Sequence, residues 1–207
     1  MPLAPILAKF RADVAQCDSL IGNVHQLGAD GNPILPVIDR QQITVAAFLN
    51  MFIAWETFLE ASLSVLMTGA ATISGTAPQR FVMPPNEAEA KKLVIGTSRY
   101  FDYGNHHYVN KMVPLYFNAG YPYQPVLNGI FNELEDLRVM RNASAHISST
   151  TQTALESLAL RITGSPQPGI VLYTLLTMSH PGTTPPTTVF ATYRGKLILA
   201  AELIAQG

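Results

Sequence analysis

The sequence predicts an all-α protein of a single domain, residues 1–207, with five or six helices and two long loop-rich insertions. Apolar residues recur at the 3–4 spacing of amphipathic helices over several long stretches. They make up 48% of the 207 residues, which is enough for a sizeable core and too many for a disordered chain. The helical spacing is largely lost in two segments, 70–124 and 165–188, which we therefore interpret as the insertions.

The first half of the chain predicts two long helices. Residues 3–27 keep their apolar side chains at 3–4 spacing, and the Gly- and Pro-rich segment 28–36 follows as a loop. A second helix is expected from an N-cap at Asp39 to about Thr68, with Gly69 closing it. Its apolar residues cover nearly the whole circumference, as expected for a helix in the middle of a bundle or at a dimer interface.

The second half predicts shorter elements. A short helix is expected over 86–96, an aromatic-rich irregular segment over 97–124, and a helix starting near Pro125 and covering 131–149. Thr153 and Glu156 match a capping box for a helix that ends near Gly164. The apolar run 170–178 can form an edge strand or a small β-hairpin within 170–188, and a last helix is expected over 189–205.

Charge and cysteine content limit the function classes. Charged residues are only 13% of the chain and the net charge is −1, so no global basic field is present to hold duplex nucleic acid, and any RNA contact would be local. So few charges indicate that part of the surface is covered by a partner or a second copy. Cys17 has no intrachain disulfide partner, which fits a reducing cytosol.

Neither a signal peptide nor a membrane span is predicted. The N-terminal segment has no basic region before an apolar one and no clear cleavage site. The longest apolar region, 43–67, contains Asn50, Glu56 and Glu60, and two mid-span carboxylates argue against insertion. The expected protein is therefore soluble and cytoplasmic.

The segment 131–149 carries the main functional clue. On a helical wheel, one apolar stripe is formed by Leu127, Ile130, Phe131, Leu134 and Ala145, and Leu137 lies beside it. Arg138 and Arg141 fall on this stripe, while Glu135, Asn142 and His146 line one edge of it. Burying an arginine side chain costs on the order of several kcal/mol unless the guanidinium is paired or faces a wet cleft.

Arg141, Asn142 and His146 could together cleave RNA. A histidine exchanges protons near neutral pH, a guanidinium stabilises a phosphate during transfer, and an amide can orient either. Five residues correspond to roughly 140° of helical turn, so the arginine and histidine of one chain converge poorly and those of two chains across a two-fold axis could converge well. In the alternative interpretation Arg141 pairs with a core carboxylate and His146 caps a helix end.

Two segments resemble the HEPN superfamily. ELEDLRVMRNASAH contains its signature, Arg-x4–6-His with Asn directly after the Arg, and FIAWETFLEASL (residues 52–63) is similar to the second bundle helix, particularly at Trp55-Glu56. The resemblance covers roughly 40–66 and 125–162 and implies an up-and-down helical bundle over the whole domain. HEPN domains usually dimerise through the motif, and many are metal-independent ribonucleases of toxin–antitoxin, abortive-infection and other defence systems. Others have lost activity and serve as binding modules.

The resemblance implies a role for each motif residue. His146 would be the acid/base, Arg141 the phosphate clamp, and Asn142 would orient one of them. Glu56 is a candidate partner for Arg138 or Arg141, either in catalysis or simply to balance a buried charge, and the same two alternatives hold for Glu135.

The implied function is a metal-independent endoribonuclease without cofactor that cuts RNA by 2′-hydroxyl attack at a homodimer interface. A nucleotidyltransferase-like antitoxin is an expected partner of the toxin form. The alternative is an inactive HEPN-like module that binds a partner protein or a nucleotide.

The remaining candidates are weaker. His106-His107 could bind a metal, but no cysteine or carboxylate stands at ligand spacing, and surface loop histidines are expected instead. The surrounding tyrosines could stack on bases or seal the bundle. The sequence contains no P-loop, no Gly-x-Ser-x-Gly, no GxGxxG and no His-Glu-x-x-His motif.

Overall fold

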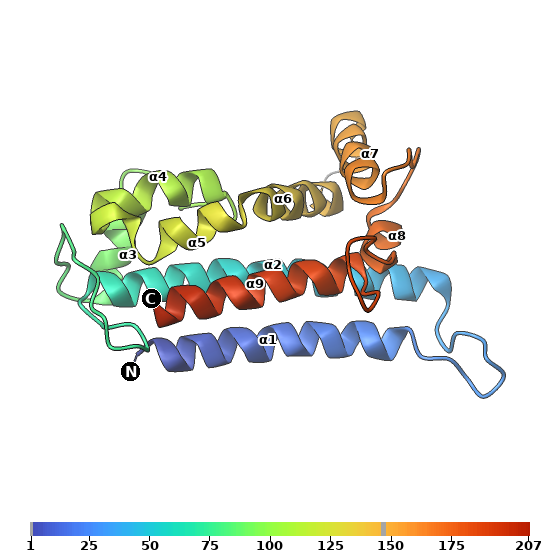
Figure 1. Ribbon diagram of the computed structural model, residues 1–207, viewed down its shortest axis with the longest axis horizontal. Coiled ribbons are helices and arrows are strands. Elements are labelled where there is room, and N and C mark those ends of the chain that lie inside the picture. The colour runs from blue at the N-terminus through green and yellow to red at the C-terminus, as the bar shows by residue number, and fades with distance from the viewer. Residues whose placement is uncertain (1, 146–147) are drawn as a thin grey trace. The chain divides into compact units, whose positions relative to one another are not determined.

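The computed structural model describes residues 2–145 and 148–207, and it confirms the all-α class (Figure 1). Within these residues, pairing of extended backbone is limited to isolated bridges at Leu27–Pro33, Arg80–Phe117 and Ser179–Thr188. The helices are α1 (Leu3–Val24), α2 (Val37–Met67), α3 (Glu87–Ile95), α4 (His106–Tyr116), the 3-10 turn η1 (Asn118–Gly120), α5 (Tyr123–Gly129), α6 (Phe131–Ala145), α7 (Ser149–Thr163), α8 (Leu172–Thr177) and α9 (Val189–Gln206).

The chain divides into two compact units, each assembled from segments far apart in the sequence. Unit 1 comprises Met1–Ala12, Ile53–Leu134 and Lys196–Gly207. Unit 2 comprises Asp13–Phe52 and Glu135–Gly195.

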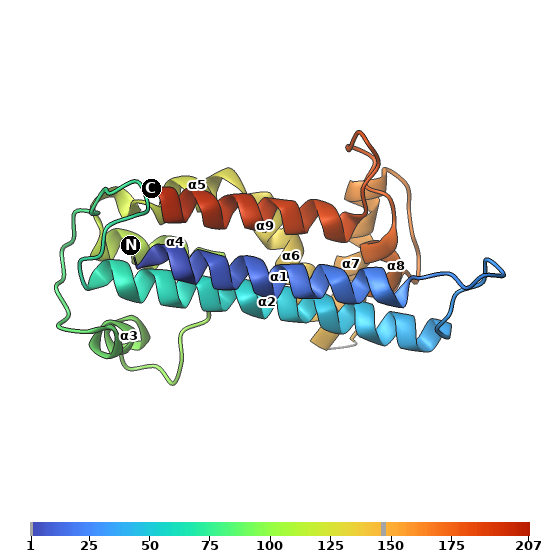
Figure 2. The ribbon, with the colours of Figure 1, turned by 90° about the horizontal axis from the view of Figure 1, so that it is seen from below.

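The core of unit 1 forms around the C-terminal half of α2. Most side chains from 58 to 67 are buried. Phe10 packs on Trp55 and Phe58 with ring centroids 6.1 and 5.3 Å away, and Trp55 stacks on Phe58 at 5.9 Å. The buried Tyr123 hydroxyl donates to Ser62 Oγ at 3.0 Å, so its polar end is satisfied inside the core. Figure 2 shows α5 running beside the C-terminal part of α9, which closes this core.

The end of α2 is held by a side chain from the loop that follows it. Arg80 Nη1 donates a 2.9 Å hydrogen bond to the Met67 carbonyl, one of the carbonyls that a helix end leaves without a partner. Gly69 has φ +104°, a conformation that favours glycine, and Arg80 lies directly over it. The predicted end of the helix at Gly69 is therefore accurate to within two residues.

The prediction of an irregular segment over 97–124 is wrong, because α4, η1 and the start of α5 lie there. Val109, Met112 and Val113 bury one side of α4 at 3–4 spacing, a pattern partly hidden by neighbouring polar and aromatic residues. The adjacent histidines are in the first turn of α4 rather than in a surface loop. His106 is buried, and both imidazole rings pack edge-on against Phe131 at 4.6 and 5.0 Å.

In unit 2 the N-terminus of α7 carries a different capping box from the predicted one. Ser148 Oγ accepts from the Thr151 backbone N–H at 3.2 Å, and Thr151 Oγ1 accepts from the Ser148 N–H at 3.0 Å. The predicted partner Glu156 instead accepts from the Gly169 N–H at 2.8 Å. Its carboxylate thereby ties the following loop to α7.

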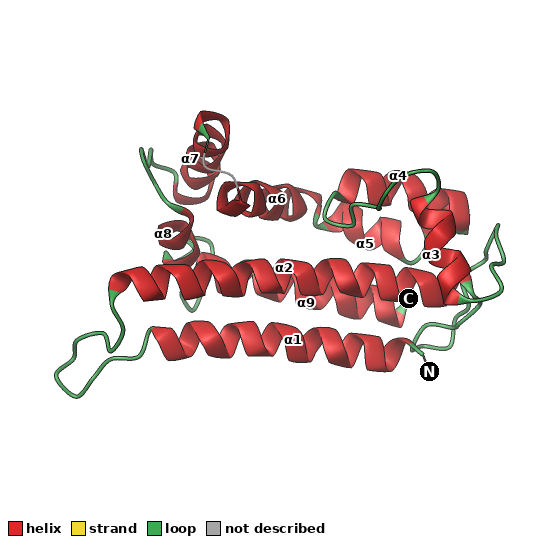
Figure 3. Cartoon of the chain, turned by 180° about the vertical axis from the view of Figure 1, so that it is seen from behind, coloured by secondary structure: helices red, strands yellow, loops and turns green. Residues whose placement is uncertain are grey.

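The expected strand or hairpin within 170–188 is wrong, since residues 172–177 form α8, a red segment between green loops in Figure 3. Ile170, Leu172, Leu175 and Leu176 are buried, which is helical rather than alternating spacing. Antiparallel pairing in this segment is confined to the isolated Ser179–Thr188 bridge, where the His180 N–H donates to the Thr187 carbonyl at 2.7 Å.

Among the described residues, α2 is the helix that is long and apolar enough to cross a membrane by length and composition. Half of that apolar window is buried inside the protein. Glu60 on this helix forms an ion pair with Lys91, Nζ to Oε1 2.7 Å, and charged side chains are costly to place inside a bilayer.

Candidate functional site

The RNASAH motif begins in the last turn of α6, within unit 2. Arg141 is exposed, and its Nη1 donates to Oδ1 of the half-buried Asn142 at 3.3 Å. Ser144 Oγ donates to the Arg141 carbonyl at 2.6 Å, which satisfies a carbonyl near the helix end. His146 lies outside the described residues. Of the three predicted catalytic residues, the structure therefore brings Arg141 and Asn142 together and leaves the place of His146 a prediction.

The apolar stripe predicted to contain Arg138 and Arg141 is not the face that α6 buries, and one cause is a break in the helix. Ile130 has φ −122° and ψ 27°, which is not helical, so α5 and α6 are separate helices. A wheel drawn continuously across this break assigns the wrong face. The side chains that α6 buries are Leu134, Asp136, Leu137 and Met140, while Arg141 turns to solvent.

The buried charge on α6 is Asp136, which is 4% exposed. Its Oδ2 accepts a 2.6 Å hydrogen bond from the Tyr193 hydroxyl, and its Oδ1 pairs with Arg161. The three residues come from α6, α9 and α7. This network fixes α6, and with it the helix end that carries Arg141.

Two of the three supporting residues of the prediction, Arg138 and Glu135, are neighbours on α6. Arg138 and Glu135 lie one turn apart on α6, with Nη1 and Oε1 at 3.9 Å and side chains 40% and 34% exposed. An ion pair this exposed contributes about 0–1 kcal/mol. Glu56 belongs to unit 1, whereas Arg138 and Arg141 belong to unit 2, so their pairing stays a prediction.

A groove of about 450 Å³ opens beside the motif in unit 2. Its walls come from the first half of α2, the end of α6 and the start of α8. The lining is mainly apolar, with a few amides and hydroxyls: Ile38, Gln41, Gln42, Val45, Ala46, Leu49, Ala143, Ser144, Val171, Leu172 and Tyr173. The volume is in the range of small-ligand sites.

An aromatic stack supports one wall of this groove. The Tyr173 ring lies parallel to the His25 ring, with centroids 5.8 Å apart and planes inclined by 8°. His25 Nε2 is hydrogen-bonded to the buried Thr44 Oγ1 at 3.1 Å. Burial, with a smaller contribution from the Arg40 charge, lowers the pKa of His25 below its ordinary value.

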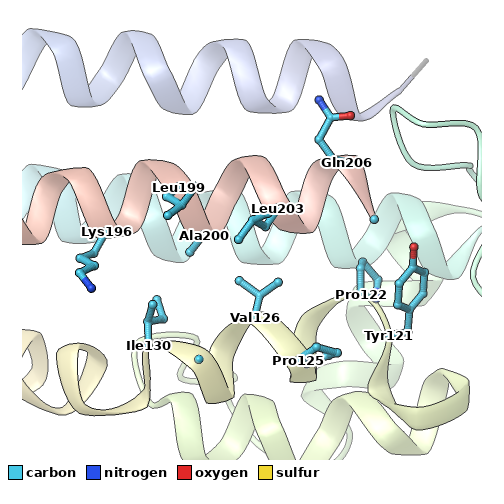
Figure 4. Close-up of a pocket in the computed structure, with 12 residues that line it drawn as sticks. Tyr121, Pro122, Pro125, Val126, Ile130, Lys196, Leu199, Ala200, Leu203 and Gln206 are labelled. Atoms are coloured by element: carbon cyan, nitrogen blue, oxygen red, sulfur yellow. The ribbon is translucent and has the colours of Figure 1, made fainter.

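Unit 1 has a cavity of its own, of about 530 Å³, between α5 and α9. Figure 4 shows Lys196 and Tyr121 near opposite ends of this cavity. Its walls between them are aliphatic and include Val126, Ile130, Leu199, Ala200 and Leu203. Lys196 Nζ is paired with Glu133 Oε1 at 3.1 Å. Its lining contains no described residue of the RNASAH motif, whereas Ala143 and Ser144 line the groove, which makes this cavity the weaker candidate.

Sequence reasoning missed both Asp136 and the Tyr173 stack. Asp136 lies 25 and 57 residues from its partners, and Tyr173 lies far along the chain from His25, so no local spacing relates them. The one local signal is that Asp136 borders an apolar row with the spacing of a buried helix face, formed by Leu134, Leu137 and Met140.

No family model, curated protein or solved structure matches the chain.

Proposed function

We propose that this protein is a HEPN-like, metal-independent endoribonuclease of a toxin–antitoxin or antiviral-defence system, acting in the cytoplasm as a homodimer. The observation that carries the proposal is the end of α6, where an exposed guanidinium and a neighbouring amide are followed four residues later by a histidine. Arg141 is open to solvent and its hydrogen bond to Asn142 is long, so a phosphate can compete for it.

These residues have the chemistry that RNA cleavage needs. A base, His146 of one copy, removes the proton from a ribose 2′-hydroxyl, and the 2′-oxygen attacks the adjacent phosphorus. The bond from phosphorus to the 5′-oxygen breaks, an acid returns a proton to that oxygen, and a 2′,3′-cyclic phosphate and a 5′-hydroxyl result. Arg141 stabilises the additional negative charge on the phosphate oxygens during the attack.

A homodimer is part of the proposal because of helical geometry. On a continuous helix Arg141 and His146 would be offset by roughly 140° and would converge poorly within one copy, whereas two copies across a two-fold axis could supply both groups. The low charge content, 13%, also fits a surface that is partly covered. A nucleotidyltransferase-like antitoxin would be the partner of the toxin form.

The test is cleavage of a fluorescent single-stranded RNA in EDTA by wild type, Arg141→Ala and His146→Ala. We expect both variants to lose activity by about a hundredfold or more, the usual effect of removing a general acid–base or a phosphate clamp. The matched control is Arg99→Ala, which removes another exposed arginine and should cleave like wild type. Intact RNA with wild type, or equal cleavage by all four proteins, would contradict the proposal, and light scattering would test the dimer.

The second candidate is an inactive HEPN-like module that binds a partner protein or a nucleotide. The observation that favours it is the groove beside the motif, whose lining is mainly apolar. Under this alternative Arg141→Ala lowers stability or dimerisation and wild type leaves RNA intact.

A further inference from the structure

The groove in unit 2 contains a braced aromatic ring. Tyr173 lines the groove and is half-buried, while its ring is stacked on His25. His25 is in turn hydrogen-bonded to the fully buried Thr44. A ring held on one side in this way loses little conformational freedom when a ligand stacks on it, so it is prepared for binding.

The polar groups of the groove suit a flat heterocycle. Gln41 and Gln42 both line it, and neither side-chain amide hydrogen-bonds to another residue in the part of the chain that the structure describes. Each amide offers one acceptor and two donors, the complement of a base edge. The third polar group is Ser144, whose hydroxyl is also bonded to the Arg141 carbonyl, which joins the groove to the motif.

We propose that this groove binds one unpaired nucleobase of the RNA strand whose phosphate Arg141 contacts, with the base stacked on Tyr173 and its edge facing Gln41 or Gln42. The inference rests on the proposed function and deepens it, because it makes single-stranded RNA the substrate class. A base inside a duplex is stacked and paired on both sides and cannot enter the groove.

A protein helix is a poorer occupant of the same groove. Helix-in-groove partners insert aliphatic anchors, which would bury the amides of Gln41 and Gln42 without new hydrogen bonds. A base satisfies those amides at its edge and uses the aromatic ring on its face.

The experiment measures binding without cleavage. A 5′-fluorescein octamer of 2′-O-methyl RNA lacks the attacking hydroxyl, and its affinity for the full chain is measured by fluorescence anisotropy at fixed salt. We expect Tyr173→Leu to bind about tenfold more weakly or worse, since one base–aromatic stack is lost, and Tyr173→Phe to bind like wild type. Tyr100→Leu is the matched control, because Tyr100 is 73% exposed and belongs to unit 1.

A second measurement uses wild type alone and so does not depend on the folding of a variant. An octamer of the same backbone with abasic residues throughout should bind at least about tenfold more weakly than the octamer with bases. Equal binding of the two octamers, equal binding by wild type and Tyr173→Leu, or no binding by wild type would overturn the inference. Ring-dependent binding by a wild type that cleaves no RNA would uphold the base site and reject the ribonuclease proposal.

Discussion

Replacing Tyr193 by phenylalanine removes a single hydroxyl from the buried network of Asp136. The Tyr193 side chain is 4% exposed and its O–H donates to Asp136 Oδ2 at 2.6 Å. The other partner of the carboxylate, Arg161, has a side chain that is 57% exposed, so that pair is screened by water. The hydrogen bond from Tyr193 therefore offsets most of the free energy that it costs to remove the Asp136 carboxylate from water.

The expected magnitude follows from this burial. A hydrogen bond to a charged group contributes about 1.5–3 kcal/mol, so Tyr193→Phe should lower the free energy of unfolding by about 2 kcal/mol. Arg161→Ala should lower it by about 1 kcal/mol or less, as for exposed ion pairs. In an Asp136→Ala background the acceptor is already gone, and Tyr193→Phe should then cost less than about 1 kcal/mol.

The assay is urea denaturation followed by circular dichroism at 222 nm for the four proteins of the double-mutant cycle. The control is Tyr100→Phe at an exposed ring, which should change the free energy of unfolding by less than about 0.5 kcal/mol. If Tyr193→Phe costs the same in both backgrounds, the hydroxyl does not stabilise the carboxylate and the reasoning fails.

Three further perturbations, two glycine substitutions and a change of pH, test other features of the structure. Gly69→Ala should destabilise the protein by about 1–2 kcal/mol, because φ is +104° there and a Cβ would lie 2.9 Å from the Arg80 guanidinium. Gly22→Ala on α1, where a Cβ meets nothing within 4 Å, should stabilise it by about 0.5–1 kcal/mol, and urea midpoints that rank the two variants the other way would refute this. The lowered pKa of His25 means that the unfolded chain takes up the proton first as pH falls below 6.5, so stability should fall from pH 7.5 to 5.5 and level off below the folded pKa. His25→Gln should reduce that loss, and an unchanged pH dependence of the urea midpoint would contradict the assignment.

Local signals predicted the helices well where each element carries its own pattern. The short helix expected over 86–96 is α3, with Asn86 as N-cap and Gly96 as C-cap, and the last helix ends one residue beyond its predicted end. The errors occur where a local pattern allows two structures. The run 170–178 is short and apolar, a composition that periodicity alone does not resolve between strand and helix.

In the candidate site, too, the contacts between sequence neighbours could be predicted and the contacts between distant residues could not. Arg141 and Asn142 are adjacent in sequence, so their contact could be expected. The register of α6 depended on a break at Ile130, for which Gly129 at the end of α5 is the one local signal. The groove could not be predicted, because three segments distant in sequence form its walls. Residues that meet only in the tertiary structure produce no regular spacing in the sequence from which their contact could be predicted.

The assembly of each unit from distant segments has a consequence for biosynthesis. Unit 2 lacks part of its chain until Gly195 has been made, and unit 1 lacks its last segment until Lys196–Gly207 follows. In the nascent chain the apolar surface of α2 therefore stays uncovered by α9 until synthesis ends. More than a hundred residues separate the two helices, and this long loop closes only when α9 packs. A ribosome that stops before α9 would release a chain in which neither unit is complete, and such a product should aggregate or be degraded rather than persist as a folded fragment.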